Sequence, residues 1–315
     1  MKALKRLFLV SLAILFILIP YTSHAVGVTP VLGTTVPAPE QAEQASNLLV
    51  KNHTTGAILY AKNENTVFSP AGGTVTLMTA KLVADTLEMD DIVLIDEEIA
   101  ILEHGSRKIG LMQGEQLTVS DLLAAMLLYG AQDAAVALAK AAAGSTDNFI
   151  ELMNEQALLL GMENAHYTNP TGAYSPEQVT TASDTVLLAE AVSDSRELMP
   201  ILSLDEYSVQ SVNTAIRTRI SNRCAMLDSG STVYDERVKG AAIGSTQETG
   251  TVSTILAEQG NSKVILVLTS QDSIELQYVT IKGLLDYGFS FEKFDMTPFV
   301  ELMASTLTFT TANGS

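Results

Sequence analysis

A threonine-rich segment that begins with glycines offers hydroxyl groups of the kind that nucleophilic enzymes use. The segment SPAGGTVTLMTAKLVADTL, residues 69–87, carries Thr74 and Thr76 where a helix would start. A hydroxyl nucleophile needs a neighbouring general base, and the nearest following lysine is Lys81. Thr76 and Lys81 would lie about 140° apart around a helix. The residues therefore favour a glycine–threonine helix start with capping hydroxyls over a threonine nucleophile.

The cysteine and histidine content points to neither thiol nor metal chemistry. Cys224 is the single cysteine, so no intrachain disulfide can form, and we expect it to be a small buried residue rather than a nucleophile. The histidines His24, His53, His104 and His166 are scattered, and no pair has helical ligand spacing. We therefore expect no metal site and no cofactor.

Composition and charge exclude some classes of binding partner. The chain has 315 residues, of which 47% are hydrophobic and 17% charged, enough for a substantial folded core. The formal net charge is −18. Nucleic-acid phosphates require lysine and arginine, so nucleic acid is not an expected partner. The same charge disfavours simple electrostatic docking on an anionic wall or membrane.

The first 25 residues have the organisation of a secretory signal peptide. Lys2, Lys5 and Arg6 precede an apolar run over residues 7–19, and small residues lead to a cleavage site after Ala25. An uncleaved signal anchor is the alternative, but the run is short for a membrane span. We expect an exported protein of the cell envelope, secreted or extracytoplasmic, with no membrane span after cleavage and a charge near −21.

The remaining chain divides into three parts by composition. Residues 26–45 are rich in Pro, Gly, Thr and Ala and indicate a flexible spacer. Residues 46–289 carry the periodic apolar pattern of one folded domain, and residues 290–315 form a C-terminal tail.

The periodicity inside the domain predicts strands at both ends and helices between them. SNLLVKN and GAILYAK flank His53-Thr54-Thr55 as a β-hairpin, and VKGAAIG, TVSTILAE and SKVILVLTS form a three-stranded meander. Helices are predicted over residues 76–87, 118–129 (with Thr118 as N-cap), 132–143, 146–160, 181–192 and 273–287. Strands from both ends are expected to share one antiparallel sheet, with the helical block inserted between them, which is an α+β fold.

The same segments resemble, in the same order, those of D-alanyl-D-alanine carboxypeptidases, the low-molecular-mass penicillin-binding proteins. LLVKNHTTGAILYAKNENTVFSPA resembles the first strands and the Pro-Ala before the family's serine. GLMQGEQLTVSDLLAAMLLYGAQDAAVALA resembles the stretch with the second active-site motif, and LMNEQALLLGMENAHYTNPTG and TTASDTVLLAEAV resemble the blocks that follow. The resemblance covers about residues 46–287. It implies a β-lactamase/transpeptidase-like fold, an antiparallel sheet flanked by helices with an inserted helical subdomain.

The resemblance also implies acyl-transfer chemistry at three motifs, Ser-x-x-Lys, Ser-x-Asn and Lys-Thr-Gly. Aligned on the Met-Thr pair of this chain, the first motif's serine falls on Gly73 and its lysine on Thr76. Aligned instead on the preceding Pro-Ala, the pair falls on Gly72 and Val75. Neither alignment supplies a serine or a lysine.

The other two motifs are changed as well. The second falls on Gly130 to Gln132, where Gln132 either hydrogen-bonds a peptide carbonyl or serves as a polar helix start, and both interpretations stay open. The third falls on Ala242, Ile243 and Gly244, where the glycine alone persists. All three motifs of the family are therefore degenerate in this chain.

Other cations are candidates to replace the lost lysines. Lys239 precedes the third motif by three residues, and an odd slip along a strand turns a side chain to the opposite face, so we expect Lys239 to face solvent. Arg217, Arg219 and Arg223 precede the same strand. We expect surface ion pairs for each of these arginines rather than a place in the pocket.

The changed motifs favour a non-catalytic homologue. Loss of a nucleophile or its base costs on the order of a millionfold in turnover in a comparable hydrolase. Backbone N–H donors, expected here at Gly73 and Ser245, leave roughly 10³–10⁴-fold over water. With both lysines lost we expect weak affinity for free D-Ala-D-Ala ends. The partner is then a peptidoglycan stem peptide or an envelope protein. The alternatives are an active serine-type D-Ala-D-Ala carboxypeptidase with displaced groups and a purely protein-binding envelope scaffold.

Overall fold

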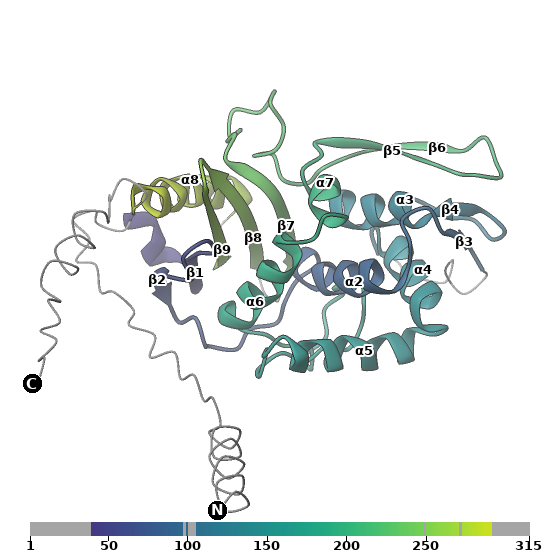
Figure 1. Cartoon of the computed structure of the whole chain (residues 1–315), viewed down its shortest axis with the longest axis horizontal. Coiled ribbons are helices and arrows are strands. Elements are labelled where there is room, and N and C mark those ends of the chain that lie inside the picture. Colours follow the sequence, from purple (N-terminus) through teal and green to yellow (C-terminus); the bar gives the residue numbers. More distant parts are fainter. Residues whose placement is uncertain (1–38, 97–98, 100–104, 249, 271–272, 292–315) are drawn as a thin grey trace, which may run out of the picture. The chain divides into compact units, whose positions relative to one another are not determined.

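A five-stranded antiparallel sheet forms the centre of the folded unit (Figure 1). The computed structural model describes residues 39–96, 99, 105–248, 250–270 and 273–291. The strands of this sheet are β1 (Asn47–Asn52), β2 (Ile58–Lys62), β7 (Val238–Thr246), β8 (Gly250–Gln259) and β9 (Ser262–Ser270), in the order β2-β1-β9-β8-β7. The N-terminal strand β1 pairs directly with β9, so the prediction that strands from both ends share one sheet is confirmed.

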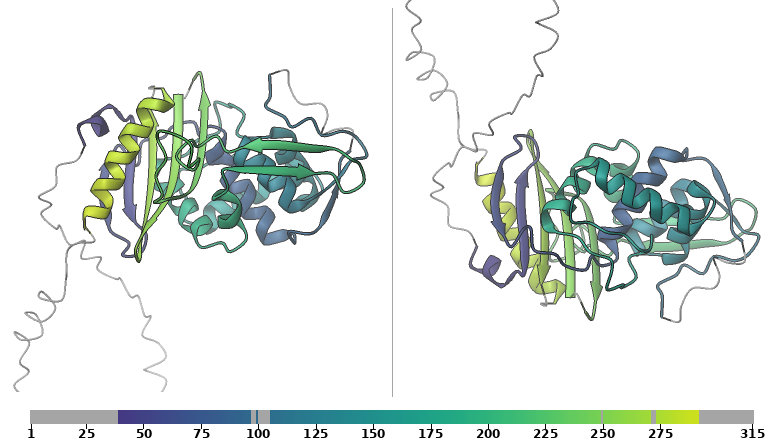
Figure 2. Two further views of the ribbon diagram at one scale, coloured as in Figure 1. Left: turned by 90° about the horizontal axis from the view of Figure 1, so that it is seen from above. Right: turned by 90° about the horizontal axis from the view of Figure 1, so that it is seen from below.

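Helices cover both faces of the sheet, as two further views show (Figure 2). The helix α8 (Ile274–Ser290) lies on one face, where Leu48, Leu266 and Leu284 join one apolar cluster. The inserted helical block lies on the other face. Its helices are α2 (Gly73–Thr86), α3 (Val119–Ala124), η3 (Ala125–Tyr129), α4 (Gln132–Ala143), α5 (Thr146–Leu159), α6 (Ala182–Ser193) and α7 (Leu198–Leu202).

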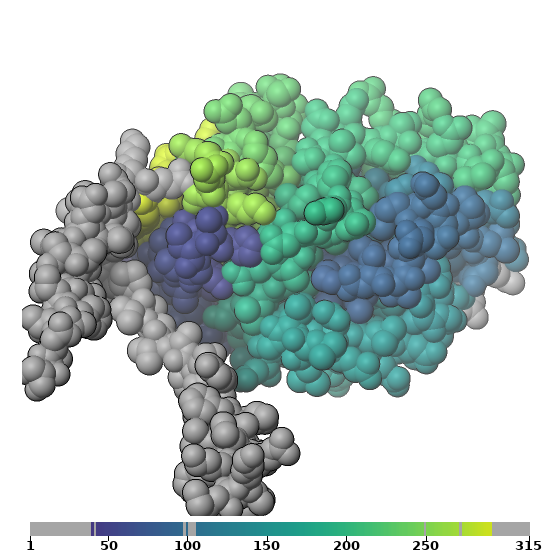
Figure 3. Space-filling model, in the orientation of Figure 1, coloured from purple at the N-terminus to yellow at the C-terminus, as the bar shows by residue number. Residues whose placement is uncertain are grey.

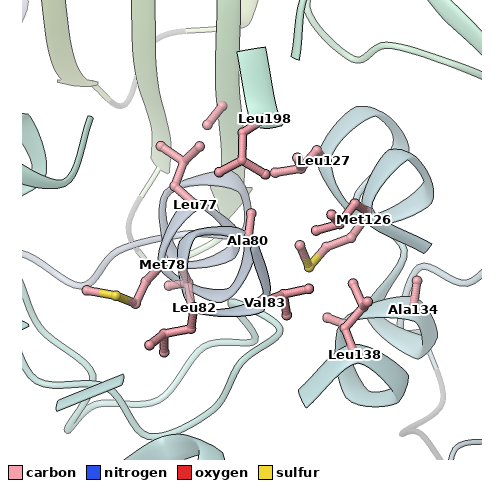
Figure 4. Packing of buried hydrophobic residues seen from close by; sticks show 14 of the residues in the cluster. Leu77, Met78, Ala80, Leu82, Val83, Met126, Leu127, Ala134, Leu138 and Leu198 are labelled. Atoms are coloured by element: carbon pink, nitrogen blue, oxygen red, sulfur yellow. The ribbon is translucent and has the colours of Figure 1, made fainter. Parts of the chain in front are cut away.

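The helix α2 is the centre of the helical block because nearly all its side chains are apolar or small. Leu77, Met78 and Val83 are at most 1% exposed. Figure 4 shows these α2 side chains beside Met126 of η3 and Leu138 of α4. Burial on this scale fixes the position and rotation of α2, and with them the place of Gly73 at its first turn.

The helix boundaries follow the predicted capping residues. Thr118 accepts a hydrogen bond from Asp121 N (3.1 Å) and starts α3, as predicted. The prediction of a single α-helix over 118–129 is wrong for its second half. Residues 125–129 form the π-helix η3, which ends at Gly130 with φ 80°. A π-turn adds one residue per turn, so it shifts the residues after it relative to an ideal α-helix.

Several elements extend beyond the predictions. Two small hairpins, β3 (Ile92–Leu94) with β4 (Gln116–Thr118) and β5 (Glu206–Gln210) with β6 (Arg217–Ser221), border the helical block. Residues 40–45 belong to the folded unit rather than to the predicted spacer, because η1 (Glu40–Gln44) forms there and Ala42 and Ala45 are buried in the α8 cluster. The predicted signal peptide and most of the tail lie outside the described residues.

The predicted burial of Cys224 is confirmed. The side chain is 1% exposed, and burial raises the pKa of the thiol to about 11. Among the residues that the structure describes, no three His, Cys, Asp or Glu side chains come together as a metal site would need. No helix within the described part of the chain is long and apolar enough to cross a membrane.

An ionic cluster joins the β1–β2 hairpin to the end of α6. His53 contacts the carboxylates of Glu190 (3.3 Å) and Asp194 (3.1 Å), while Lys51 pairs with Glu190 (2.7 Å) and Lys263 with Asp194 (3.5 Å). In the space-filling view the purple surface of the hairpin lies against the green surface of α6 (Figure 3). The hydrogen bond from His53, the strongest influence, lowers the pKa of Asp194.

This cluster predicts an acid-sensitive contribution to stability. A carboxylate whose pKa is lowered by folding stabilises the fold above its ordinary pKa of 3.8 and loses that contribution as the pH falls through the lower folded value. We expect Asp194→Asn to be less stable than wild type in denaturant titrations at neutral pH, with the difference vanishing in more acidic solution. Glu248→Gln, at an exposed residue, is the control. A difference that grows on acidification would contradict this assignment.

Candidate active site

Three glycines bring three segments into direct backbone contact where the family motifs were placed. A Cβ atom on Gly73 would lie 2.5 Å from Ile243 N and 2.8 Å from the carbonyl carbon of Ala242. A Cβ on Gly244 would lie 2.3 Å from Ala71 O, and one on Gly172 would lie 2.5 Å from Gly72 Cα. The start of α2, the strand β7 and the loop that ends at Gly172 therefore touch through main-chain atoms.

The loop at residues 169–172 is held in this position by its own side chains. Asn169 Oδ1 accepts hydrogen bonds from Thr171 N (3.1 Å) and Gly172 N (2.9 Å), a local turn typical of asparagine. Thr79 of α2 donates to Pro170 O (2.7 Å). Gly172 O in turn accepts from Gly72 N (3.1 Å), so the loop and the helix start are tied together.

The first motif's positions hold no catalytic pair. Gly73 has no side chain, and Thr76 Oγ1 donates to Gly73 O (3.0 Å) inside the helix. The Thr74 hydroxyl is buried, with no hydrogen-bond partner among the described residues. Lys81 pairs with Asp85 one turn along the helix. Thr76 and Lys81 therefore have separate partners, as their helical spacing predicts.

The second motif's positions form the corner between η3 and α4. Gln132 N donates to Arg107 O (2.9 Å), so the main chain of Gln132 fixes the preceding loop. The carboxylate of Asp133, 2% exposed, accepts from Gly110 N (2.9 Å), Leu111 N (3.1 Å) and Ile109 N (3.3 Å). Gln132 and Asp133 together hold residues 107–111 against the start of α4, a role that sequence reasoning did not assign to either residue.

Two arginines lie close to Gly130. A Cβ on Gly130 would be 3.4 Å from Arg223 Nη1 and 3.5 Å from Arg107 Cδ. Arg223 Nη1 donates to Ile243 O (2.9 Å), which joins the second motif's positions to the third. Burial lowers the pKa of the Arg223 guanidinium below its usual range, and the charge of Arg107 lowers it further. Arg107 also lies 5.2 Å from the ring centre of Tyr129.

The expected surface ion pairs hold for one of the three candidate arginines. Arg219 pairs with Glu206, whereas Arg217 donates to the amide oxygen of Gln210. Arg223 lies at the site instead, contrary to the expectation. Sequence reasoning missed Arg107 altogether, and the available signal was an arginine in the loop HGSRKIG before the second motif.

The remaining predicted positions lie around the same strand. Lys239 is exposed and donates to Glu236 O (2.7 Å), as its predicted solvent-facing role requires. Ser245, one of the two expected backbone donors, lies two residues beyond Ile243 on β7. A cavity of about 620 Å³ opens there, lined among others by Arg223, Ser245 and Glu275.

Comparison with solved structures places this fold among the DD-peptidases and DD-transpeptidases. The Streptomyces K15 DD-transpeptidase is 26% identical, with a TM-score of 0.73 over 81% of this chain and 100% of that chain. A D-alanyl-D-alanine carboxypeptidase from Mycobacterium tuberculosis H37Rv is 23% identical, with a TM-score of 0.72 over 81% of this chain and 94% of that one, and supports the fold alone. The predicted β-lactamase/transpeptidase-like α+β fold is confirmed.

Sequence comparison then gives the family. The profile of peptidase family S11, D-alanyl-D-alanine carboxypeptidase, matches residues 33–273, and the chain belongs to this family. The carboxypeptidase DacF of Bacillus subtilis (strain 168) is 27% identical over 80% of this chain, and DacC of Escherichia coli (strain K12) is 29% identical over 82%. The chain spans 64% of the length of each of these two curated relatives.

Proposed function

We propose that this chain is an exported, non-catalytic member of the D-alanyl-D-alanine carboxypeptidase family, and that it binds a ligand in the cell envelope. Its family acts on peptidoglycan peptides, so a stem peptide is the proposed ligand. The observation that carries the proposal is the contact at Gly73: the space that a serine side chain would need is occupied by the backbone of Ile243.

The physical reason is that a nucleophile cannot be supplied at this position by rearranging side chains. Main-chain atoms of β7 are fixed on the other edge by the ladder to β8, with Ile243 opposite Ser253 and Gly244 opposite Val252. Moving β7 away from α2 would therefore disturb the central sheet. The absence of both family lysines removes the base as well, and this supports the same conclusion.

The experiment is the intact mass of the purified domain after incubation with excess benzylpenicillin. A protein without an acylable nucleophile should keep its mass, while its circular dichroism shows that it is folded. An active D-alanyl-D-alanine carboxypeptidase of the same family, treated in parallel, gives the expected adduct. A mass increase equal to the drug would reject the proposal in favour of an active enzyme with displaced groups, and peptide mapping would locate the residue.

A purely protein-binding scaffold is the second candidate, favoured by the acidic net charge of −18. Co-sedimentation with purified peptidoglycan separates the two, because a protein scaffold with no affinity for stem peptides would stay in the supernatant.

A further inference from the structure

Arg107 and Arg223 are two like charges that lie near each other at the corner where the second motif was placed. Both come within 3.5 Å of the position that a Cβ on Gly130 would take, Arg107 through its Cδ and Arg223 through its Nη1. Within the part of the chain that the structure describes, neither forms an ion pair with a carboxylate. Many of the other cations do, including Lys51, Lys81 and Arg237.

Main-chain contacts bring the two arginines together in spite of their repulsion. The Arg107 carbonyl accepts from Gln132 N (2.9 Å), while Arg223 N donates to Leu128 O (3.0 Å). The Tyr278 hydroxyl of α8 donates to Arg223 O (3.2 Å). Because these contacts attach both segments to the η3–α4 corner, the main chains that carry the two arginines are held close together.

The two guanidinium groups keep donors available for a ligand. A guanidinium carries five N–H donors in a planar fork, and Arg223 uses Nη1 for the carbonyl of Ile243. Arg107 is exposed, and Gly130, which both arginines approach, has no side chain of its own. The cavity that Arg223 lines also includes Glu275, an exposed residue at the start of α8.

We propose that Arg107 and Arg223 bind an oxyanion over Gly130, either the carboxylate of a peptide end or a phosphate. An anion placed there would neutralise the repulsion between the two arginines and accept charge-assisted hydrogen bonds from both. This proposal adds a ligand class to the proposed function. It rests on that function in one respect, namely that this corner binds a ligand and performs no chemistry on it. It gives the site a positive charge that the lost lysines no longer supply.

Calorimetric titration of the folded protein tests the site. The three ligands are diacetyl-L-lysyl-D-alanyl-D-alanine, its C-terminal amide and inorganic phosphate. We expect binding of the free acid or of phosphate but not of the amide, and competition if both anions bind. Arg107→Ala should weaken that binding by about tenfold or more, the loss of one charge-assisted hydrogen bond, and added salt should weaken it further.

Arg217→Ala is the matched control, since it removes the same charge from an exposed arginine on β6 that has no carboxylate partner among the described residues. Arg223→Lys keeps the charge but loses the fork, and it should also weaken binding. Equal binding of acid and amide, equal effects of Arg107→Ala and Arg217→Ala, or no binding of either anion would each overturn the site. These outcomes are independent of penicillin acylation, so failure of the oxyanion site and failure of the non-catalytic assignment can be told apart.

Discussion

Restoring the family's serine and lysine in the double variant Gly73→Ser, Thr76→Lys should destabilise this protein and leave it unable to react with penicillin. The serine Cβ would lie 2.5 Å from Ile243 N, well inside van der Waals contact. Overpacking of a filled core costs roughly 1–3 kcal/mol, and a clash with backbone leaves no flexible side chain to move. Helix propensity alone would favour serine over glycine, so a loss of stability isolates the steric effect.

The single variant Gly73→Ser, measured by denaturant titration, gives this result without the second change. Gly230→Ser is the matched control, because a Cβ on Gly230 would meet only a side-chain oxygen of Asp228, at 3.2 Å. Wild-type stability of Gly73→Ser together with a penicillin adduct on the double variant would mean that β7 gives way readily. The contact between α2 and β7 would then be no barrier to catalysis.

Asp133→Ala should be the most damaging change next to the second motif's positions. The carboxylate accepts hydrogen bonds from three successive loop N–H groups, those of Ile109, Gly110 and Leu111, and from Ala134 N (3.0 Å). Loss of a buried acceptor leaves these donors without a partner, and hydrogen bonds to charged groups contribute about 1.5–3 kcal/mol each. We expect the free energy of unfolding to fall by roughly 3 kcal/mol or more.

Asp133→Asn and Asp228→Ala are the comparison variants for this prediction. The amide retains one acceptor oxygen and should give an intermediate loss. Asp228 is exposed, and among the described residues its carboxylate accepts only from Gly230 N (2.8 Å). The Asp133 carboxylate holds the loop at residues 109–111, which follows Arg107. Amide hydrogen exchange at residues 109–111 should therefore accelerate in Asp133→Ala. Unchanged exchange and a loss equal to that of Asp228→Ala would show that the loop is held by other contacts.

Local chemistry was sufficient to predict most of the elements. The helix at residues 132–143 has the predicted bounds, since Gly144 with φ 78° ends it and the alanine-rich run favours a helix. The β-hairpin at His53 and the three-stranded meander followed from alternating apolar runs. The β5–β6 hairpin was missed because its strands, EYSVQ and RTRIS, have four of five residues exposed or half-buried and little apolar signal.

The sequence by itself determined the family and the order of most elements, and it predicts that the first motif's positions hold neither a serine nor a lysine. Only the tertiary structure decided what fills the site: three glycines allow the backbones of α2, β7 and the loop at Gly172 to touch. It also decided that Arg107 and Arg223, more than 100 residues apart in the sequence, lie close to Gly130. The reason is physical. Periodicity and capping act within one element, whereas these contacts depend on how the central sheet and the helical block pack against each other.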